Sequence, residues 1–256
     1  MTRDAGYQVF DEAQFQRALG QPRLQGHVPT FLKSNRAEPI RVIPEPELQA
    51  TTRQWFVDFE RKLEHLSAKL GQDLSWVMVW AKKYWWSFLA RDMSLNAELY
   101  APDMTYIDPT TFGRTIVGND EFVTYNFAFF DAIPDWRYDP LPDQVYVDVT
   151  PEGKVRTVIR YLGSGHWTGP LKLYPYDDSA PKIHGDGRFI QAPAVDRYHF
   201  NDDGLMEHGE TLYDAFDVLQ RAGVMPRDDS WQVHTLFGAS RVLATATRLK
   251  RRLGRA

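Results

Sequence analysis

The hydrophobic residues in the first part of the chain recur with the period of an amphipathic helix. From residue 52 to residue 70, apolar side chains return every three or four positions, which predicts a helix that buries one face. Thr51 or Thr52 is suited to cap the start of this helix, and Gly71 is suited to end it. Residues 1–48 contain scattered prolines and no sustained period, so we expect an irregular segment there that wraps a surface.

A second helix is predicted to follow almost at once and to be well buried. It begins at Asp73 or Ser75 and runs to about residue 89, and its sequence WVMVWAKKYWWSFLA is apolar around most of the circumference. A short helix is expected at 94–100, and a helix rich in aromatic residues at 121–132. We expect these helices to cover one face of a sheet.

The second half of the chain is typical of β-structure, because hydrophobic and polar residues alternate there. The run Asn-Asp-Asp-Gly at 201–204 favours a hairpin turn, and residues 169–188 form a long loop. The predicted strands are 104–108, 115–117, 136–138, 144–149, 154–167, 189–200 and 205–213, with a helix at 214–222. This order of elements predicts an α+β fold, in which a curved antiparallel sheet is wrapped around helices and encloses a pocket.

The same pattern divides the chain into three parts. Residues 1–72 form an N-terminal extension with an irregular segment and a helix, residues 73–225 form the main domain, and residues 226–256 form a helical tail. In the tail we expect a helix from about Ser240. The tail is basic through Arg241, Arg248, Lys250, Arg251, Arg252 and Arg255. A solvated basic end is the simpler interpretation, and an anionic partner is the alternative.

Composition restricts the classes of protein to which the chain can belong. With 256 residues, of which 43% are hydrophobic and 14% aromatic, the chain can fill one large core. The net charge of −4 shows no basic bias, so we expect no nucleic-acid partner. The absence of cysteine excludes disulfides, thiolate metal sites and a cysteine nucleophile. No apolar run approaches the ~20 residues of a membrane helix, so we expect a cytoplasmic protein without a membrane partner.

Two aspartates are candidate catalytic residues, because each lies in an apolar strand. The proline that follows Asp108 biases it away from the helical region, which places it at a strand end. Asp196 shares its predicted face with Ala192, Ala194 and Tyr198, and burial on such a face raises the pKa of a carboxyl group. A protonated Asp196 could donate a hydrogen bond to an oxyanion, while Asp108 acts as a general base.

Each candidate also has an ordinary structural interpretation. Asp108 could only cap a turn, and Asp196 could point outward and pair with Arg197 or Arg160. Tyr84, on the buried helix, is a further candidate, although a core tyrosine that seeks a partner for its hydroxyl is the more common case.

Other polar residues give weaker indications of chemistry. His166 in the run GSGHWTG could be an auxiliary acid or base, although a lone histidine is more often structural. Glu207, His208 and Glu210 share the last strand, but no further His or Cys has a supporting spacing, so we expect no metal site. The chain has no Walker loop, no Rossmann glycine fingerprint and no Gly-x-Ser-x-Gly elbow, which favours chemistry without a nucleotide cofactor.

Two segments resemble the NTF2-like superfamily, in its SnoaL-like polyketide cyclase and ketosteroid isomerase branches. They are LYAPDMTYIDP followed by GRTIVGNDEF, and AVDRYHFNDDGLMEHGETLYDAFDVLQRAG, which is similar to the closing hairpin of the family. The resemblance covers about residues 75–223 and implies an NTF2-like cone. It also implies that Asp108 is the base, that Asp196 is the protonated acid of an oxyanion hole, and that Tyr84 assists it.

From the residues and the resemblance together we expect a cofactor-independent acid/base enzyme. It would be an isomerase, cyclase or lyase that stabilises an enolate or alkoxide of a hydrophobic aromatic or polycyclic small molecule. One alternative is a dehydratase or C–C lyase on an aryl substrate, which would use His166 or Lys83. Another alternative is a non-catalytic module that binds small molecules or proteins.

The expected substrate-binding residues are Trp80, Lys83, Trp86, Tyr106, Phe127, Phe130, Trp136 and Tyr198. The N-terminal extension and the loop 169–188 depart from the family pattern and leave the substrate open. We further expect a homo-oligomer, either a dimer or a trimer, because one sheet face and the extension expose apolar surface.

Overall fold

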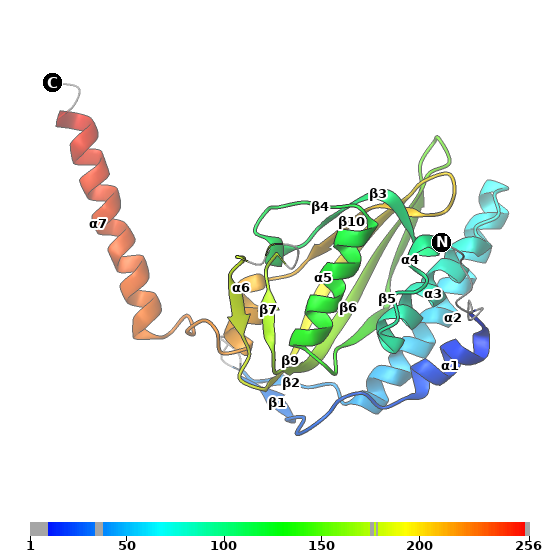
Figure 1. Cartoon of the computed structure of the whole chain (residues 1–256), viewed down its shortest axis with the longest axis horizontal. Coiled ribbons are helices and arrows are strands. Elements are labelled where there is room, and N and C mark those ends of the chain that lie inside the picture. The colour runs from blue at the N-terminus through cyan, green and yellow to red at the C-terminus, as the bar shows by residue number, and fades with distance from the viewer. Residues whose placement is uncertain (1–9, 34–37, 175–176, 178, 254–256) are drawn as a thin grey trace.

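The computed structural model describes residues 10–33, 38–174, 177 and 179–253 of the chain. Three helices come first and form a layer beside the sheet (Figure 1). They are α1 (Glu12–Gly20), α2 (Glu45–Leu70) and α3 (Ser75–Ala90). Between α1 and α2, the two-residue strands β1 (Phe31–Leu32) and β2 (Ile40–Arg41) pair with each other.

Helix α1 lies in a segment for which we predicted no regular structure, and that prediction was wrong. Asp11 caps the helix, because its side chain accepts a hydrogen bond from the backbone N–H of Gln14 at 2.6 Å. Phe15, Ala18 and Leu19 form the buried face. The spacing of these three residues was a helical signal, but it was too short to stand out among the prolines around it.

Helix α2 begins seven residues before the expected start at Thr52. Pro44 is the capping residue, and a proline is tolerated in the first turn that follows because the N–H groups there have no partner in the helix. The hydroxyl of Thr51 donates to the carbonyl of Glu47 within the helix and therefore caps nothing. At the other end Gly71 takes the left-handed conformation with φ 65°, which confirms it as the residue that ends the helix.

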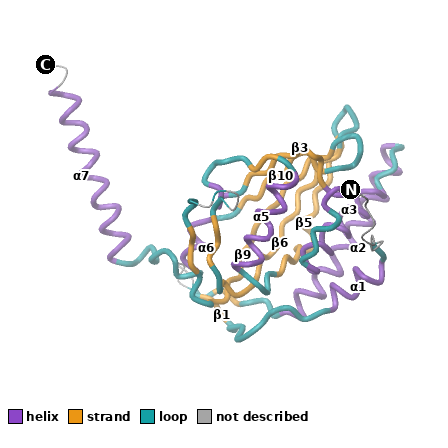
Figure 2. The backbone as a smooth tube through the Cα atoms, viewed as in Figure 1, coloured by secondary structure: helices purple, strands orange, loops and turns teal. Residues whose placement is uncertain are grey.

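A curved sheet of six strands forms the centre of the molecule (Figure 2). Its strands are β3 (Tyr100–Ile107), β4 (Ile116–Val117), β5 (Arg137–Val149), β6 (Val155–Trp167), β9 (Arg188–Phe200) and β10 (Met206–Leu212). Their order in space is β4-β3-β10-β9-β6-β5. All neighbours are antiparallel except β3 and β10, which run parallel because the chain crosses over from one to the other through the rest of the domain.

Two parts of the sheet region differ from the prediction. β5 is one long strand with an irregularity between Pro140 and Val145, where we expected two separate strands. In the predicted loop 169–188, the strands β7 (Pro170–Lys172) and β8 (Lys182–His184) form a small antiparallel sheet of their own. Their short length gave too little alternation for the sequence pattern to reveal them.

The remaining helices lie between and after the strands. They are α4 (Asn96–Leu99), a 3₁₀ turn (Pro109–Thr111), α5 (Asn119–Ala132), α6 (Ala215–Arg221) and α7 (Trp231–Leu253). In Figure 1, α5 crosses one face of the sheet, and α7 projects away from all other elements. Helix α7 begins at Trp231, well before the expected start near Ser240. Within the described residues, no helix is both long and apolar enough to cross a membrane.

The N-terminal extension and the sheet share one core. Phe15 of α1 and Trp55 and Phe59 of α2 are buried in the same cluster as Trp85 of α3 and Tyr138 of β5. The rings of Trp55 and Trp85 lie 5.3 Å apart between centroids, and the indole N–H of Trp85 donates to the carbonyl of Tyr138 at 2.9 Å. The extension therefore packs into the domain instead of lying as a separate unit.

A buried ionic cluster fixes the start of α2 to β5. Arg137 donates to both carboxylate oxygens of Asp139, at 2.7 and 2.9 Å, and to Glu45 at 2.6 Å. The hydroxyl of Thr52 completes the cluster with a bond of 2.9 Å to Asp139. Because Arg137 and Asp139 are almost completely buried, their mutual pairing is needed to compensate for the loss of hydration.

Candidate functional site

A cavity of about 380 Å³ lies between the sheet, α3 and α5, and it is the feature most suited to bind a small molecule. The hairpin of β7 and β8 and helix α6 contribute to its far wall. Aliphatic and aromatic side chains make up most of the lining. The polar groups that reach it are those of Tyr84, Tyr106, Asp108, Thr110, Tyr125, Asn126, Tyr138, Tyr161, Asp196, Thr211 and Tyr213.

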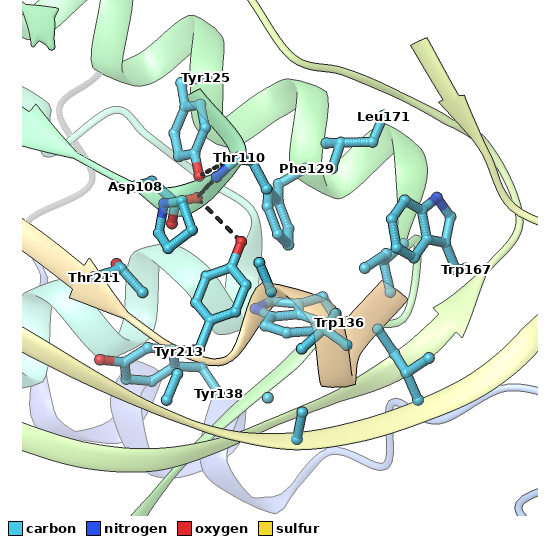
Figure 3. Close-up of a pocket in the computed structure, with 18 of the residues that line it drawn as sticks. Asp108, Thr110, Tyr125, Phe129, Trp136, Tyr138, Trp167, Leu171, Thr211 and Tyr213 are labelled. Atoms are coloured by element: carbon cyan, nitrogen blue, oxygen red, sulfur yellow. Dashed lines mark hydrogen bonds between the residues drawn. The ribbon is translucent and has the colours of Figure 1, made fainter. Parts of the chain in front are cut away.

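Asp108 lies at the point where β3 ends and the 3₁₀ turn begins. Its Oδ1 accepts hydrogen bonds from the backbone N–H of Thr110 at 2.8 Å, from the Thr110 hydroxyl at 2.6 Å and from the Tyr213 hydroxyl at 3.2 Å (Figure 3). The hydroxyl of Tyr125 lies beside the same group, 3.1 Å from that of Thr110. The Tyr125 hydroxyl also interacts with this carboxyl group, and within the described part of the chain none of the bonds from Thr110 and Tyr213 ends on Oδ2. Asp108 thus caps the turn, as its ordinary interpretation requires, and its carboxyl group also lines the cavity.

Asp196 is held in a different way, because both of its oxygens accept hydrogen bonds. The hydroxyls of Tyr138 and Tyr198 each donate to Oδ2 at 2.5 Å, and the hydroxyl of Thr211 donates to Oδ1 at 2.8 Å. Thr211 lies directly opposite Asp196 in the pairing of β9 with β10. Thr211 is in turn bonded to the hydroxyl of Tyr106.

Burial is the main reason why both carboxyl groups are easier to protonate than usual. It raises the pKa of Asp196 to about 6, although the three hydroxyl donors act in the opposite direction. It also raises the pKa of Asp108, again against the hydrogen bonds from Thr110 and Tyr213. The direction of the shift is the one that we expected for a carboxyl group on a buried apolar face, and the protonated state of Asp196 at neutral pH stays a prediction.

Tyr84 joins this network through Tyr198. The two hydroxyl oxygens lie 2.7 Å apart, and Tyr198 also bonds Asp196. The single hydroxyl proton of Tyr198 can serve only one of these two contacts at a time. When the Tyr198 hydroxyl donates its hydrogen bond to an ionised Asp196, the hydroxyl of Tyr84 can donate either to Tyr198 or into the cavity. Burial raises the pKa of Tyr84 well above its ordinary value, so this hydroxyl stays a donor.

Aromatic rings form the apolar walls. Tyr161 stacks on Tyr138 with ring centroids 3.7 Å apart, and Phe129 meets Trp136 edge-on at 5.4 Å. Gly163 lies directly beneath Trp136, and a Cβ atom there would come within 2.2 Å of the indole. These flat walls are suited to a planar ligand.

The structure brings together only part of the predicted site. Asp108, Asp196 and Tyr84 all line the cavity, and so do Tyr106, Phe130 and Trp136. Tyr198 is fully buried behind Asp196 and acts on the cavity through it. The parity that placed Asp196 on one face with Ala192, Ala194 and Tyr198 is confirmed, because all four are buried. The outward-facing Arg197 pairs with Glu210 instead of with Asp196.

The other predicted substrate-binding residues lie outside the cavity. Trp80 stacks behind Tyr84 and donates its indole N–H to the carbonyl of Leu99 at 2.9 Å. Trp86 packs edge-on against Phe10. Phe127 is 43% exposed, on the side of α5 that faces away from the sheet. Helical position alone did not show which side each ring would face.

His166 and Lys83 are also remote from the two carboxyl groups of the cavity. His166 bonds Asp135 through Nδ1 at 2.6 Å and the carbonyl of His27 through Nε2 at 3.2 Å, and it borders a second, more polar hollow. Lys83 pairs with Glu98 at 2.6 Å near the surface. Both side chains serve contacts within the fold, so the alternative that used them as acid and base loses its geometric basis.

The sequence did not reveal several polar residues of the cavity. Tyr138, Thr110, Tyr125, Thr211 and Tyr213 all contact a carboxyl group or its hydroxyl partners. Even for Thr211 the turn at 201–204 gave the wrong signal. Pairing counted from Met206 with Phe200 would place Glu210 opposite Asp196, and the irregularity between Met206 and His208 shifts the register by one residue to Thr211. Within the described residues, no three of His, Cys, Asp and Glu lie together in a way that could hold a metal ion.

Comparison with known proteins identifies the family of the chain. A family model described as a SnoaL-like domain matches residues 81–208, which is half of the chain. No curated protein matches the chain.

Several solved structures are similar in part. One is a putative polyketide cyclase from Xanthomonas campestris pv. campestris, with 16% identity over 56% of this chain and 93% of that chain, at a TM-score of 0.41. Another is an NTF2-like protein of unknown function from Burkholderia pseudomallei K96243. It is 17% identical over 57% of this chain and 95% of that chain, and the TM-score is 0.41. A steroid delta-isomerase from Pseudomonas aeruginosa is 15% identical over 57% of this chain and 85% of that chain, and the TM-score is 0.37. On the strength of the family model, which matches half of its residues, the chain belongs to the SnoaL-like family.

Proposed function

We propose that this protein is an enzyme that moves a proton on a hydrophobic small molecule inside the cavity. The observation that carries the proposal is the presence of two buried carboxyl groups, Asp108 and Asp196, in one largely apolar cavity. Perturbed carboxyl groups in such a place are typical of acid/base sites. The side chains of the chain itself supply the base and the hydrogen-bond donors, so the reaction that we propose calls for no bound cofactor.

Asp108 is the group best suited to take the proton. Its Oδ2 can approach a C–H or O–H bond of a ligand, while Thr110 and Tyr213 hold the carboxyl group in place through Oδ1. The raised pKa brings the strength of this base closer to neutrality, where a proton acceptor is most effective.

The hydroxyl groups around Asp196 are suited to stabilise the negative charge that forms on the ligand. Tyr84, Tyr138 and Tyr161 line the cavity, and within the described residues Tyr161 makes no hydrogen bond of its own. An ionised Asp196 orients the hydroxyls of Tyr138 and Tyr198 and leaves the proton of Tyr84 free for an oxyanion. In this proposal Asp196 acts as a positioning residue, whereas the family resemblance implies a protonated acid that donates to the oxyanion directly.

The shape of the cavity favours a flat ligand with one polar end. The polar groups gather near β3, β9 and β10, whereas Leu171, Ile183, Ile190 and Leu219 leave the opposite end apolar. An aromatic or polycyclic ketone that enolises matches this division, because its carbonyl would lie among the hydroxyls and its rings between Trp136 and Tyr161. The similarity of the chain to SnoaL-like proteins agrees with a small-molecule substrate.

The proposal can be tested by proton exchange before the natural substrate is known. A panel of bicyclic aromatic ketones such as tetralones is incubated with the protein in D₂O, and exchange of the α-hydrogens is followed by NMR. We expect exchange with the native protein and a loss of at least about a hundredfold in the Asp108→Asn variant, because general-base catalysis contributes at least that much. Asp148→Asn, at an exposed position of β5, is the matched control and should exchange at the native rate.

Two outcomes would contradict the proposal in different ways. Full exchange by Asp108→Asn would show that another group is the base. If ketones quench tryptophan fluorescence on binding, yet no member of the panel exchanges, the cavity belongs to a non-catalytic binding module.

A further inference from the structure

Within the described residues, the C-terminal helix α7 does not line the cavity and has no role in the proposed reaction. It is 23 residues long and extends away from the sheet and the other helices (Figure 1). Large apolar side chains on it are open to solvent, including Trp231 at 73%, Leu236 at 64% and Leu243 at 69% exposure. A soluble helix with such residues needs a surface that covers them.

Most exposed residues of α7 are divided between a cationic and an apolar face, although Phe237, which is also exposed, lies on the same side as Arg241. His234, Arg241 and Arg248 follow one another at intervals of seven residues, which is two helical turns, so they share one face. The apolar face contains Leu236, Ala239, Leu243 and Ala246, and its centre lies roughly 170° around the axis from Arg241 and Arg248. Lys250 follows on the apolar side near the end of the helix, where its long stem can carry the charge back toward water.

The charge of this segment has one sign only. Residues 230–256 contain six lysines and arginines and no acidic residue, although the whole chain has a net charge of −4. The other residues contain 24 lysines and arginines and 34 acidic residues, a net charge of −10, so the tail is opposite in sign to the rest of the chain. A surface that covers α7 should be both negatively charged and able to accept apolar side chains.

We propose that α7 binds an anionic lipid surface, with its axis in the plane of the membrane. Leu236 and Leu243 would enter the boundary between headgroups and acyl chains, while Arg241 and Arg248 contact the headgroups. This arrangement requires no helix that spans the bilayer, and it revises our expectation that the protein has no membrane partner. The proposal rests on the exposure and charge of α7 and is independent of the reaction in the cavity.

A second copy of the chain is a less suitable cover for α7. Paired helices are held in register by opposite charges beside their apolar seam, and α7 has no acidic residue to supply them. Two parallel copies would also bring the cluster of cations near each C-terminus together. An anionic membrane can contact both faces of the helix, because its headgroups attract the arginines and its acyl chains accept the leucines.

Vesicle flotation tests the proposal with the full chain. Vesicles of phosphatidylcholine alone are compared with vesicles that also contain phosphatidylserine. We expect the protein to float only with the anionic vesicles and to be released by high salt. The double variant Arg241→Gln/Arg248→Gln should bind roughly 30-fold more weakly, since each cation near the surface contributes about a factor of five. Leu236→Ser/Leu243→Ser should also lose most of the binding.

The matched control removes two cations elsewhere. Arg17→Gln/Lys69→Gln changes exposed residues of α1 and α2 and should bind like the native protein. The proposal is overturned if the native protein ignores phosphatidylserine, or if the control weakens binding as much as the variants of α7. Light scattering without lipid supplies the other contrary outcome: an oligomer that Leu236→Ser/Leu243→Ser dissociates would identify a second copy as the cover.

Discussion

Asp108 and Asp196 share one cavity but differ in how their oxygens are used. Within the described residues, the bonds from Thr110 and Tyr213 reach only Oδ1 of Asp108, whereas both oxygens of Asp196 accept hydrogen bonds from hydroxyls. This difference divides the roles: Oδ2 of Asp108 can accept a proton from a ligand, and a saturated carboxylate can orient its donors. The strand pattern predicted that Asp196 faces inward with Tyr198, but it contained no information on how many donors would meet it.

Because Asp196 is buried, we expect the free energy of unfolding to depend on pH through this residue. Its pKa is about 6 in the folded protein and 3.8 as the ordinary value, so the folded state retains the proton to higher pH. As pH rises from about 4 to above 6, the folded state therefore loses stability through this group, by roughly 3 kcal/mol. Asp196→Asn cannot titrate, and its free energy of unfolding should lack this decline. Urea unfolding of both proteins across this pH range measures the difference, and parallel curves would contradict the assignment.

At some positions a side chain from a neighbouring segment packs so closely on a strand that only glycine fits there. Gly163 of β6 occupies such a position, because Trp136 lies directly on it. The sequence predicted the strand and the alternation of its faces, yet it did not show which ring would occupy the space above the glycine. That contact depends on how β5 is aligned with β6.

Gly163→Ala should therefore disturb the wall of the cavity. The new methyl group would force Trp136 to move, which we expect to lower the free energy of unfolding by about 1–3 kcal/mol and to weaken ligand binding. Gly238→Ala is the control, because Gly238 lies in α7 with open space around it and alanine favours the helix. Equal effects of the two substitutions in thermal unfolding would exclude the close contact with Trp136.

The link between α2 and β5 gives a second prediction about elements. Arg137→Met removes the partner of the buried Asp139 and should lower the free energy of unfolding by about 3–5 kcal/mol. Lys154→Met breaks the exposed pair with Asp202 and should have a far smaller effect, because water screens exposed charges. Denaturant unfolding of the two variants tests this contrast. A mild effect of Arg137→Met would mean that Asp139 is hydrated or protonated.

For the whole molecule, a homo-oligomer stays a prediction. Phe112 and Phe216 line the cavity and are 67% and 65% exposed, and Val117 and Leu212 are exposed on the strands β4 and β10. Apolar surface of this kind is usually covered in solution. Size-exclusion chromatography with light scattering should give two or three times the chain mass of 29.6 kDa. A monomer at all concentrations would contradict this expectation.

The sequence by itself determined which segments become helices or strands and which faces they bury. Residue periodicity, capping residues and turn residues act over a few positions, so they can be identified without knowledge of the fold. The helices α2, α3 and α5, the strands β6, β9 and β10, and the inward face of Asp196 were predicted in this way. The SnoaL-like resemblance, based on short motifs, added the expected pairing of Asp108 with Asp196.

Only the tertiary structure decided which side chains meet in the cavity. Tyr138 reaches Asp196 because β5, β6 and β9 lie side by side, and Tyr213 reaches Asp108 because β10 runs parallel to β3. The same geometry places His166 outside the cavity, where it contacts the carbonyl of His27 in the N-terminal segment. Contacts between residues far apart in the chain depend on strand order and register, and these arise from packing of the whole core rather than from local preference.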